Sequence, residues 1–234
     1  MSPVGKSLEG AFRLALPRMR VSEGNPWMRK PAAIALARQT IMQEADALRS
    51  LAASLGGAFW ETCELIAGCK GIVWVTGVGT SGAIGIRFAH ILTDCGVRSI
   101  FLSPDLGLHG HSGAMAPSEI LVAISRGGES TEVNEMAAIA NARSLETIAF
   151  VDDEGSALAR ICRHVLPVHS PKEYELGGYC ATASTVVCSA ACDAVCAVVL
   201  KLKRYTVEEF ARTHPGGAVG LAVSKGSPNT GGRE

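Results

Sequence analysis

This sequence of 234 residues contains few aromatic residues and no excess of charge of either sign. Only 5% of the residues are aromatic, and 22 basic residues balance 22 acidic ones. A protein that binds nucleic acid non-specifically needs a basic excess, so this class is excluded. With 47% apolar residues and few rings, the core must be mainly aliphatic, which fits α/β packing better than a β-sandwich.

Long apolar runs are missing as well. No stretch reaches the ~18 apolar residues of a membrane span. The apolar run at 12–16 is too short for a signal-peptide core and contains Arg13. The eight cysteines are not spaced as C-x-x-C, which leaves a zinc ribbon or a redox motif unsupported. So many unpaired thiols indicate a reducing compartment, and we expect a soluble cytoplasmic protein.

From residue 72 onward, short apolar segments alternate with amphipathic ones. Strands are predicted at 72–75, 97–102, 120–124, 147–151 and 164–168. Helices are predicted at 32–54, 55–68, 83–95, 131–143, 156–162, 181–202 and 207–212. This alternation predicts an α/β fold with a parallel sheet covered by helices on both faces, and ligands then bind beyond the carboxyl ends of the strands.

Three segments with different patterns define the domain organisation. Residues 1–31 are interrupted by prolines and locally basic, and we interpret them as an N-terminal extension. Residues 32–223 carry the alternating pattern, and 224–234 form a Gly/Ser/Pro-rich tail that we expect to be disordered. In the long helix at 181–202, Cys188, Cys192 and Cys196 recur every four residues, which indicates small buried side chains.

A glycine-rich loop, 76–82, lies between the first strand and its helix. Glycines let the backbone approach a ligand, and the N–H groups and dipole of the following helix favour an anion. Thr80 and Ser81 add hydroxyl donors. The loop also matches the G-x-G-x-x-G fingerprint of dinucleotide sites, but the acidic residue that should hold a ribose is poorly placed, because Asp105 stands behind Pro104.

A second loop, 125–131, again runs from a strand end to a helix start. It contains hydroxyls, two glycines and Arg126. Two neighbouring strand ends with such donors suit one phosphomonoester, which has three acceptor oxygens, better than a dinucleotide. The alternative is ordinary N-capping by Ser130 or Thr131, which leaves Arg126 and the glycines unexplained.

Three further segments contain chemically capable side chains. His109 and His111 stand two residues apart in a loop, where a metal pair would lack a third ligand. Glu173 and Glu175 lie between the last strand and the long helix, where solvated surface acids are the simpler interpretation. His214 begins a His-Pro-Gly-Gly turn whose geometry Pro and Gly explain, but not the histidine.

Taken in order, the motifs GVGTSGAIG, HGHSG, AISRGGESTE, the Glu173 segment followed by TAST, and THPGGAVG form a set. Together they resemble the SIS (sugar isomerase) domain family, and within it bacterial D-arabinose-5-phosphate isomerases, from about residue 32 to 221. The paired CBS domains common after this domain do not follow in the sequence. The resemblance implies a three-layer, flavodoxin-like sandwich around a five-stranded parallel sheet, and a homotetramer with shared active sites.

The resemblance also implies functional residues. It places the substrate phosphate at Ser81, Ser125 and Ser130, and from the two loops themselves we also expect Gly79, Thr80 and Arg126 to contact the phosphate. The functional carboxylates map onto Glu132 and Glu173, and the histidines onto His109 and His214, the last reaching a site shared between subunits. The implied reaction interconverts an aldose and a ketose phosphate, of the arabinose 5-phosphate type, without a cofactor or a metal. Glu173 is expected to move the proton, His214 to open the ring, His109 to polarise the carbonyl oxygen and Glu132 to orient the substrate.

The chain departs from the pattern of these isomerases at three places. Thr80 replaces the lysine of G-x-G-K-S-G, His111 replaces the aspartate of H-G-D, and the loop that reads S-N-S-G-E becomes 125–129 with one hydroxyl fewer. A cation lost at 80 and gained at Arg126 predicts a different sugar or pose. A non-catalytic sugar-phosphate-binding module and an NAD(P)-dependent oxidoreductase remain as alternatives. The absence of an appended DNA-binding or CBS domain and the presence of Glu173, His109 and His214 favour the enzyme.

Overall fold

The computed structural model describes residues 29–216 and Gly220. The predicted disordered tail at 224–234 and nearly all of the predicted extension at 1–31 therefore lie outside the described residues. Among the described residues, those from Thr40 onward form one compact unit, and those up to Gln39 belong to a separate one. The helix α1 (Lys30–Ser54) crosses this boundary, and its buried residues, Ala47 and Leu51, lie in the compact unit.

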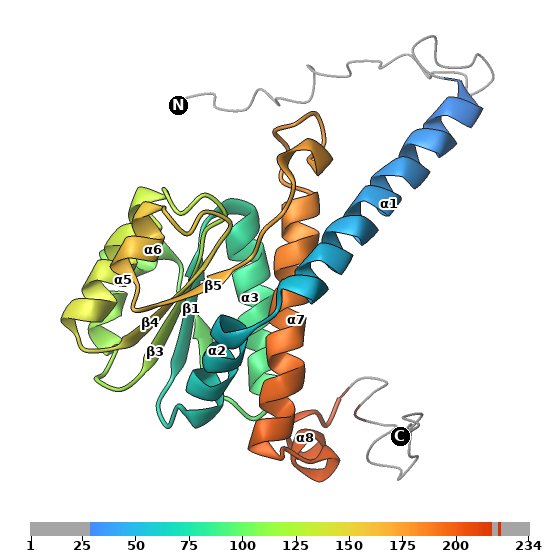
Figure 1. Cartoon of the computed structure of the whole chain (residues 1–234). Coiled ribbons are helices and arrows are strands. Elements are labelled where there is room, and N and C mark those ends of the chain that lie inside the picture. The colour runs from blue at the N-terminus through green and yellow to red at the C-terminus, as the bar shows by residue number, and fades with distance from the viewer. Residues whose placement is uncertain (1–28, 217–219, 221–234) are drawn as a thin grey trace, which may run out of the picture. The chain divides into compact units, whose positions relative to one another are not determined.

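Five parallel strands form one sheet in the order β2-β1-β3-β4-β5 (Figure 1). The strands are β1 (Val73–Gly77), β2 (Ser99–Phe101), β3 (Ile120–Ile124), β4 (Glu146–Val151) and β5 (His164–Pro167). All five predicted strands are present, and the sheet is parallel, so the predicted α/β fold is confirmed.

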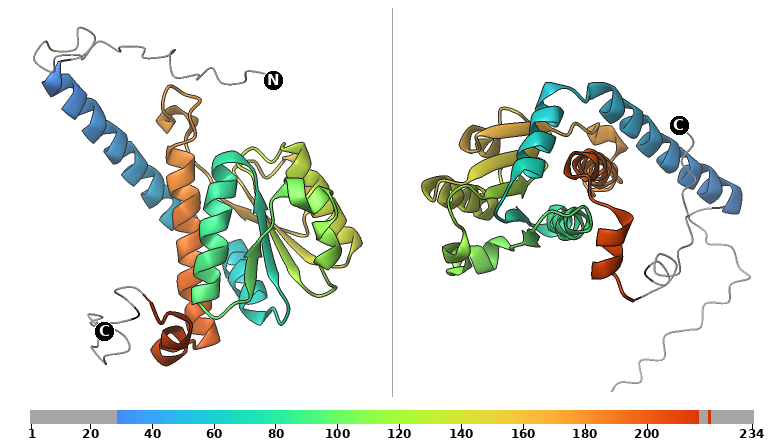
Figure 2. Two further views of the ribbon diagram at one scale, coloured as in Figure 1. Left: turned by 180° about the vertical axis from the view of Figure 1, so that it is seen from behind. Right: turned by 90° about the horizontal axis from the view of Figure 1, so that it is seen from below.

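Helices cover both faces of this sheet (Figure 2). One face packs against α2 (Gly57–Gly68), α3 (Gly79–Asp94) and α7 (Ala183–Lys203), and the other against α4 (Pro104–Leu108), α5 (Thr131–Ala142) and α6 (Ala157–Ile161). The strand residues alternate between the two cores. Along β3, Val122 and Ile124 join the core beneath α3 and α7, whereas Leu121 and Ala123 join the core beneath α5. Both faces of the strand are thus apolar, as expected for a buried parallel strand.

The long helix α7 is the most apolar element of the fold. Its best 18-residue window has a mean hydropathy of 2.0, so among the described residues it is long and apolar enough to span a membrane. This corrects the expectation that no stretch reaches that length. However, 44% of the window is buried inside the protein, as is usual for a core helix, so the pattern is weak support for a membrane span. Cys192 and Cys196 are buried on its core face, which confirms the prediction for these two residues, whereas Cys188 is only half-buried.

Several elements differ from the sequence prediction. The helix α3 begins at Gly79, four residues before the predicted start, and α4 and the short helices η1 (His111–Ala114) and η2 (Lys172–Tyr174) were not predicted. The signal for α4 is nevertheless present in the sequence. Ser103 accepts a hydrogen bond from the Leu106 N–H as its N-cap, and Pro104 occupies the first turn, a common pair at helix starts. The last described helix, α8 (Val207–Thr213), has a complete capping box between Thr206 and Glu209.

Candidate functional site

The site lies where the strand order changes direction: β2 is added on one side of β1, and β3 and the later strands on the other. β1 and β3 are neighbours, with Gly77 paired to Ile124 at their carboxyl ends. The helix after β1 packs on one face of the sheet and the helix after β3 on the other. Loops that diverge in this way leave an opening between them, the usual ligand position in doubly wound sheets.

The first loop is short, because α3 already begins at Gly79. Gly79 has φ +55°, a conformation that side chains disfavour. A Cβ at Gly82 would lie only 2.8 Å from the Gly77 carbonyl oxygen, so glycine is needed there for the turn to close. Thr80 and Ser81 therefore stand in the first turn of α3, rather than in a loop before it. The N–H groups of this turn have no partners within the helix, which suits an anion.

In the second loop, two serine hydroxyl groups lie close together. Ser125 is buried, and its Oγ lies 3.4 Å from the Oγ of Ser130. Ser130 is the N-cap residue of α5, yet its side chain makes no capping hydrogen bond. Ordinary capping therefore does not account for this hydroxyl. A hydrogen bond from the α5 residue Asn134 stabilises the loop: its Nδ2 donates to the Gly128 carbonyl oxygen at 3.2 Å.

Two hollows flank the first turn of α3. One is lined by Thr80, Ser81, Arg126 and the α7 residues Ser184 and Thr185. The structure thus brings three of the predicted phosphate-binding residues together. Sequence reasoning did not assign a role to Ser184 and Thr185, although their segment, TAST, belongs to the motif set.

The other hollow lies beside β2. Gly79, His109 and Glu132 line it, and so does Asp105. His109 follows the last residue of α4, and Glu132 stands in the first turn of α5; both side chains are exposed. The predicted polarising histidine and orienting carboxylate therefore share one groove with the first glycine-rich turn.

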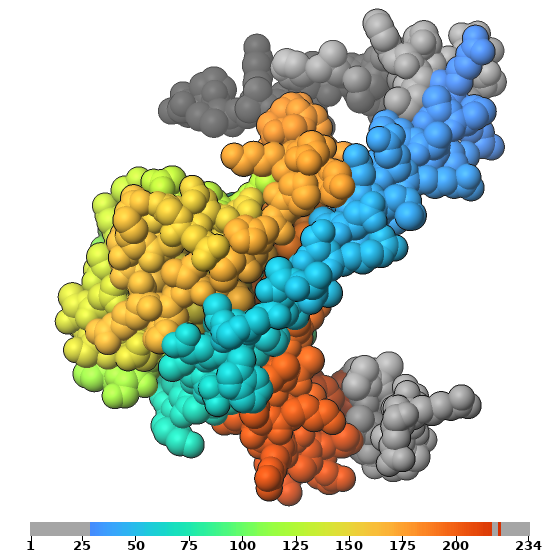
Figure 3. Space-filling model, in the orientation of Figure 1, coloured from blue at the N-terminus to red at the C-terminus, as the bar shows by residue number. Residues whose placement is uncertain are grey.

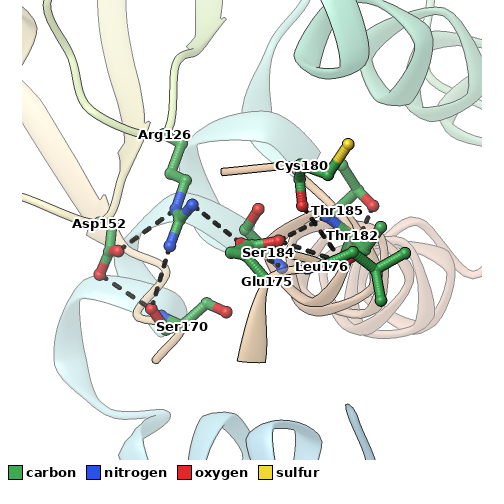
Figure 4. Close-up of polar contacts among 9 residues, drawn as sticks. All are labelled: Arg126, Asp152, Ser170, Glu175, Leu176, Cys180, Thr182, Ser184 and Thr185. Atoms are coloured by element: carbon green, nitrogen blue, oxygen red, sulfur yellow. Dashed lines mark hydrogen bonds and ion pairs between the residues drawn. The ribbon is translucent and has the colours of Figure 1, made fainter. Parts of the chain in front are cut away.

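Arg126 lies between the carboxyl ends of the strands and the start of α7 (Figure 4). Its Nη1 is 2.8 Å from Oε1 of Glu175, and its Nε is 3.6 Å from Oδ2 of Asp152. Its Nη2 donates to the Ser170 carbonyl oxygen at 3.4 Å. Although Arg126 lines the hollow beside Thr80, all three guanidinium nitrogens face protein acceptors.

Glu175 is the buried member of the acidic pair. Its side chain is 1% exposed, and its carboxylate accepts hydrogen bonds from the N–H groups of Thr182 (2.5 Å) and Ser184 (3.1 Å) at the start of α7. Burial raises the pKa of Glu175, but the hydrogen bonds from Ser184 and Thr182 and the charge of Arg126 outweigh it, so the pKa lies below its usual value. The interpretation of both acids as solvated is therefore wrong for Glu175.

Glu173, in contrast, is exposed. It lies in η2, within the segment that connects β5 to α7, and this segment, coloured orange, projects above the green and yellow part of the molecule in Figure 3. An exposed carboxylate is accessible to a substrate. The two acids, only two residues apart, thus have different environments.

His214 lies far from the other predicted residues. Its Nε2 is 3.0 Å from Oδ1 of Asp94, and its ring stacks on Phe210 with centroids 3.8 Å apart. Asp94 ends the 16-residue helix α3, whose first turn contains Ser81, so roughly 24 Å of helix separates the two ends. Figure 1 likewise shows α8 and the Glu173 segment at opposite ends of α7. Within one chain, His214 cannot act together with Ser81.

No group of three His, Cys, Asp or Glu side chains within the described part of the chain could hold a metal ion. His109 and His111, the pair considered from the sequence, thus have no third ligand there.

Comparison with known proteins identifies the family. The SIS domain model matches residues 65–198. The chain belongs to the SIS domain family. Arabinose 5-phosphate isomerase KpsF of Escherichia coli is 31% identical over 191 residues, which are 81% of this chain and 60% of KpsF. The chain thus spans about 60% of the length of this curated relative.

Solved structures agree with this assignment. A Listeria monocytogenes protein, described as a candidate sugar-phosphate isomerase, has a TM-score of 0.77 and 31% identity, over 81% of this chain and all of its own. An Escherichia coli CFT073 protein in complex with arabinose 5-phosphate also has a TM-score of 0.77, with 26% identity over 80% of this chain and all of its own. The SIS resemblance and the flavodoxin-like fold expected from the sequence are both confirmed.

Proposed function

We propose that this protein is an aldose–ketose isomerase of a phosphorylated sugar, of the arabinose 5-phosphate/ribulose 5-phosphate type. The observation that carries the proposal is the pairing of two donor-rich loops at the carboxyl ends of β1 and β3. The first turn of α3 supplies Ser81, and the second loop supplies Ser125 and Ser130, whose hydroxyls are 3.4 Å apart. Together they offer hydroxyl and N–H donors to a group with three acceptor oxygens.

The reaction needs one proton to move between two carbons. Glu173 removes the proton from C2 of the open-chain aldose, and the C2–H electron pair forms the C1–C2 double bond while O1 takes a proton. In the enediol that results, O2 then gives up its proton, the C2–O2 bond becomes the ketose carbonyl, and C1 receives the proton that Glu173 carried. The exposed position of Glu173 on η2 leaves its carboxylate accessible to a bound sugar.

His109 and Glu132 act in the groove beside α3. A histidine N–H directed at O1 or O2 stabilises the charge that develops on the carbonyl oxygen. The carboxylate of Glu132, in the first turn of α5, accepts hydrogen bonds from sugar hydroxyls and orients the substrate. Both residues line the same hollow as Gly79, which supports their action on one ligand.

His214 is assigned to the site of another subunit. It lies at the end of α3 opposite its own phosphate loop, so its role in ring opening requires a second copy of the chain. A homotetramer with shared active sites satisfies this requirement, because residues at opposite ends of one subunit can then meet across an interface.

A substrate screen tests the proposal. The thermal stability of the purified protein is measured with C4 to C7 aldose and ketose phosphates, and each stabilising compound is then incubated in D₂O. Isomerisation with deuterium incorporation at the carbon that receives the proton supports the enzyme. Binding without turnover or exchange supports the sugar-phosphate-binding module, and a fluorescence response to NAD(P)H without sugar binding supports the oxidoreductase.

A further inference from the structure

Arg126 contacts both ends of the short segment that carries Glu173. At one end, its Nη2 donates to the carbonyl oxygen of Ser170; at the other, its Nη1 pairs with the carboxylate of Glu175. Glu173 lies between these two anchors. A segment fixed at both ends by one planar guanidinium group has few conformations left, so the position of Glu173 depends on Arg126.

The anchors are themselves firmly held. Glu175 is buried and bonded to the first turn of α7 through Thr182 and Ser184. At the other end, the N–H of Ser170 donates to Oδ1 of Asp152 at 3.4 Å, and Oδ2 of Asp152 is the third partner of Arg126. The backbone completes this arrangement, because the N–H of Asp152 donates to the Arg126 carbonyl oxygen at 2.8 Å.

We propose that Arg126 is a positioning residue that fixes the Glu173 segment against the phosphate loop. The inference rests on the proposed function for the role of Glu173. Arg126 directly follows Ser125, so the loop that binds phosphate and the segment that carries the base are joined through one residue. The sequence predicts that Arg126 contacts the substrate phosphate, but in the structure its Nη1 is paired at 2.8 Å with the buried carboxylate of Glu175.

Arginine is suited to this task and lysine is not. The planar guanidinium group directs its nitrogens in fixed directions, and here Nε, Nη1 and Nη2 reach three different acceptors. A lysine would keep the charge and one contact and lose the connection between the two ends of the segment. The Arg126→Lys variant therefore separates positioning from charge.

Two measurements on the full chain test the proposal, with Arg87→Met as the matched control. Arg87 forms a bidentate ion pair with Asp193, at 2.7 and 3.0 Å, between α3 and α7 and away from both loops. In Arg126→Met, hydrogen–deuterium exchange of the amides at 170–182 should rise roughly fivefold or more, because the local opening becomes easier. In Arg87→Met, the exchange of this segment should stay as in the wild type.

Kinetics give the second readout. We expect Arg126→Met to lower kcat by about tenfold to a hundredfold, since misplacement of a catalytic group by ~1 Å can cost this much. KM and the dissociation constant of inorganic phosphate should change less than about threefold, and Arg126→Lys should recover only part of kcat. Weaker phosphate binding with normal kcat would make Arg126 a phosphate ligand and overturn the proposal.

The two proposals fail in different ways. If the wild-type protein turns over no sugar phosphate, the proposed isomerase fails, while the exchange measurement still decides whether Arg126 holds the segment. If exchange at 170–182 is the same in Arg126→Met and in the wild type, the positioning role is wrong even for an active enzyme. Glu175→Gln provides a second route, because it removes the same ion pair and should also raise exchange in this segment.

Discussion

The Nε2 atom of His214 lies 3.0 Å from Oδ1 of Asp94, the last residue of α3, whereas Ser81 stands in the first turn of the same helix. One helix thus carries a phosphate-loop residue at its start and contacts the predicted ring-opening histidine at its end. An active site that uses both Ser81 and His214 must therefore take the two residues from different copies of the chain.

Mixed oligomers test this arrangement. Glu173→Gln and His214→Ala should each be inactive alone. After unfolding and refolding a 1:1 mixture, about a quarter of the sites should contain both wild-type residues, because each site draws them independently from two subunits. Recovery of ~25% of wild-type activity is therefore expected. The matched control mixes Glu173→Gln with Glu173→Ala, which should stay inactive, and a His214 mixture that also stays inactive would place both residues in the same subunit.

Glu173→Gln tests the assignment of the base. The amide cannot accept the C2 proton, so turnover and solvent deuterium incorporation should fall by roughly 10²–10⁴-fold, the range for a lost general base. Binding of the sugar phosphate should be retained, since Glu173 is exposed and is not one of the residues proposed to hold the phosphate. Glu64→Gln is a suitable control, because that carboxylate is exposed on α2, beside the amino ends of the strands, and lies outside the proposed chemistry. Near-normal turnover in Glu173→Gln would remove it from the base role.

The double variant Ser125→Ala/Ser130→Ala tests the anion site. Each lost hydrogen bond to a charged group costs about 1.5–3 kcal/mol, so the loss of two should lower the affinity for the substrate by about a hundredfold or more. The measurement is a titration with inorganic phosphate and with the best sugar phosphate from the screen. Ser50→Ala controls for general effects, because that hydroxyl donates to the Asp46 carbonyl oxygen within α1. An unchanged affinity would place the anion elsewhere.

The sequence predicts the architecture well because β-strand burial leaves a clear local pattern. The predicted strand at 120–124 coincides with β3, in which all five residues are buried. The start of α3 was predicted wrongly because Gly79 and Gly82 read as a loop, and only the close contact of Gly82 with the Gly77 carbonyl shows that the helix begins within the glycine-rich stretch.

The site is less predictable, because its geometry depends on contacts between distant segments. Glu173 and Glu175 stand two residues apart, and nothing in the surrounding sequence distinguishes them. Glu175 is the buried one because it contacts Arg126 and the first turn of α7. Similarly, the sequence places His214 before a Pro-Gly turn, but its distance from Ser81 follows from the packing of α8 on the end of α3. Such differences carry no signal in a single sequence.

The depressed pKa of Glu175 predicts a specific dependence of stability on pH. Its unfolded pKa is about 4.3, and the folded value is lower, so the ionised carboxylate stabilises the folded state at all pH values above ~4.3. This contribution decreases as the pH falls through the folded pKa. Glu175→Gln lacks it at every pH, and the lost charge-assisted bonds correspond to roughly 1.5–3 kcal/mol.

Thermal unfolding of the two proteins from pH 3 to 7 measures this contribution. The Tm of Glu175→Gln should lie about 4–10 °C below that of the wild type at pH 7, and the difference should shrink below pH ~4. The pKa of Glu119 is also lowered: burial raises it, but hydrogen bonds from Trp74 and two backbone N–H groups outweigh burial. Because Glu119 is present in both proteins, the difference in Tm between them reports on Glu175 alone. Glu64→Gln, on the exposed face of α2, should show no such difference. A Tm difference that is constant with pH would mean that Glu175 acts through packing rather than through its charge.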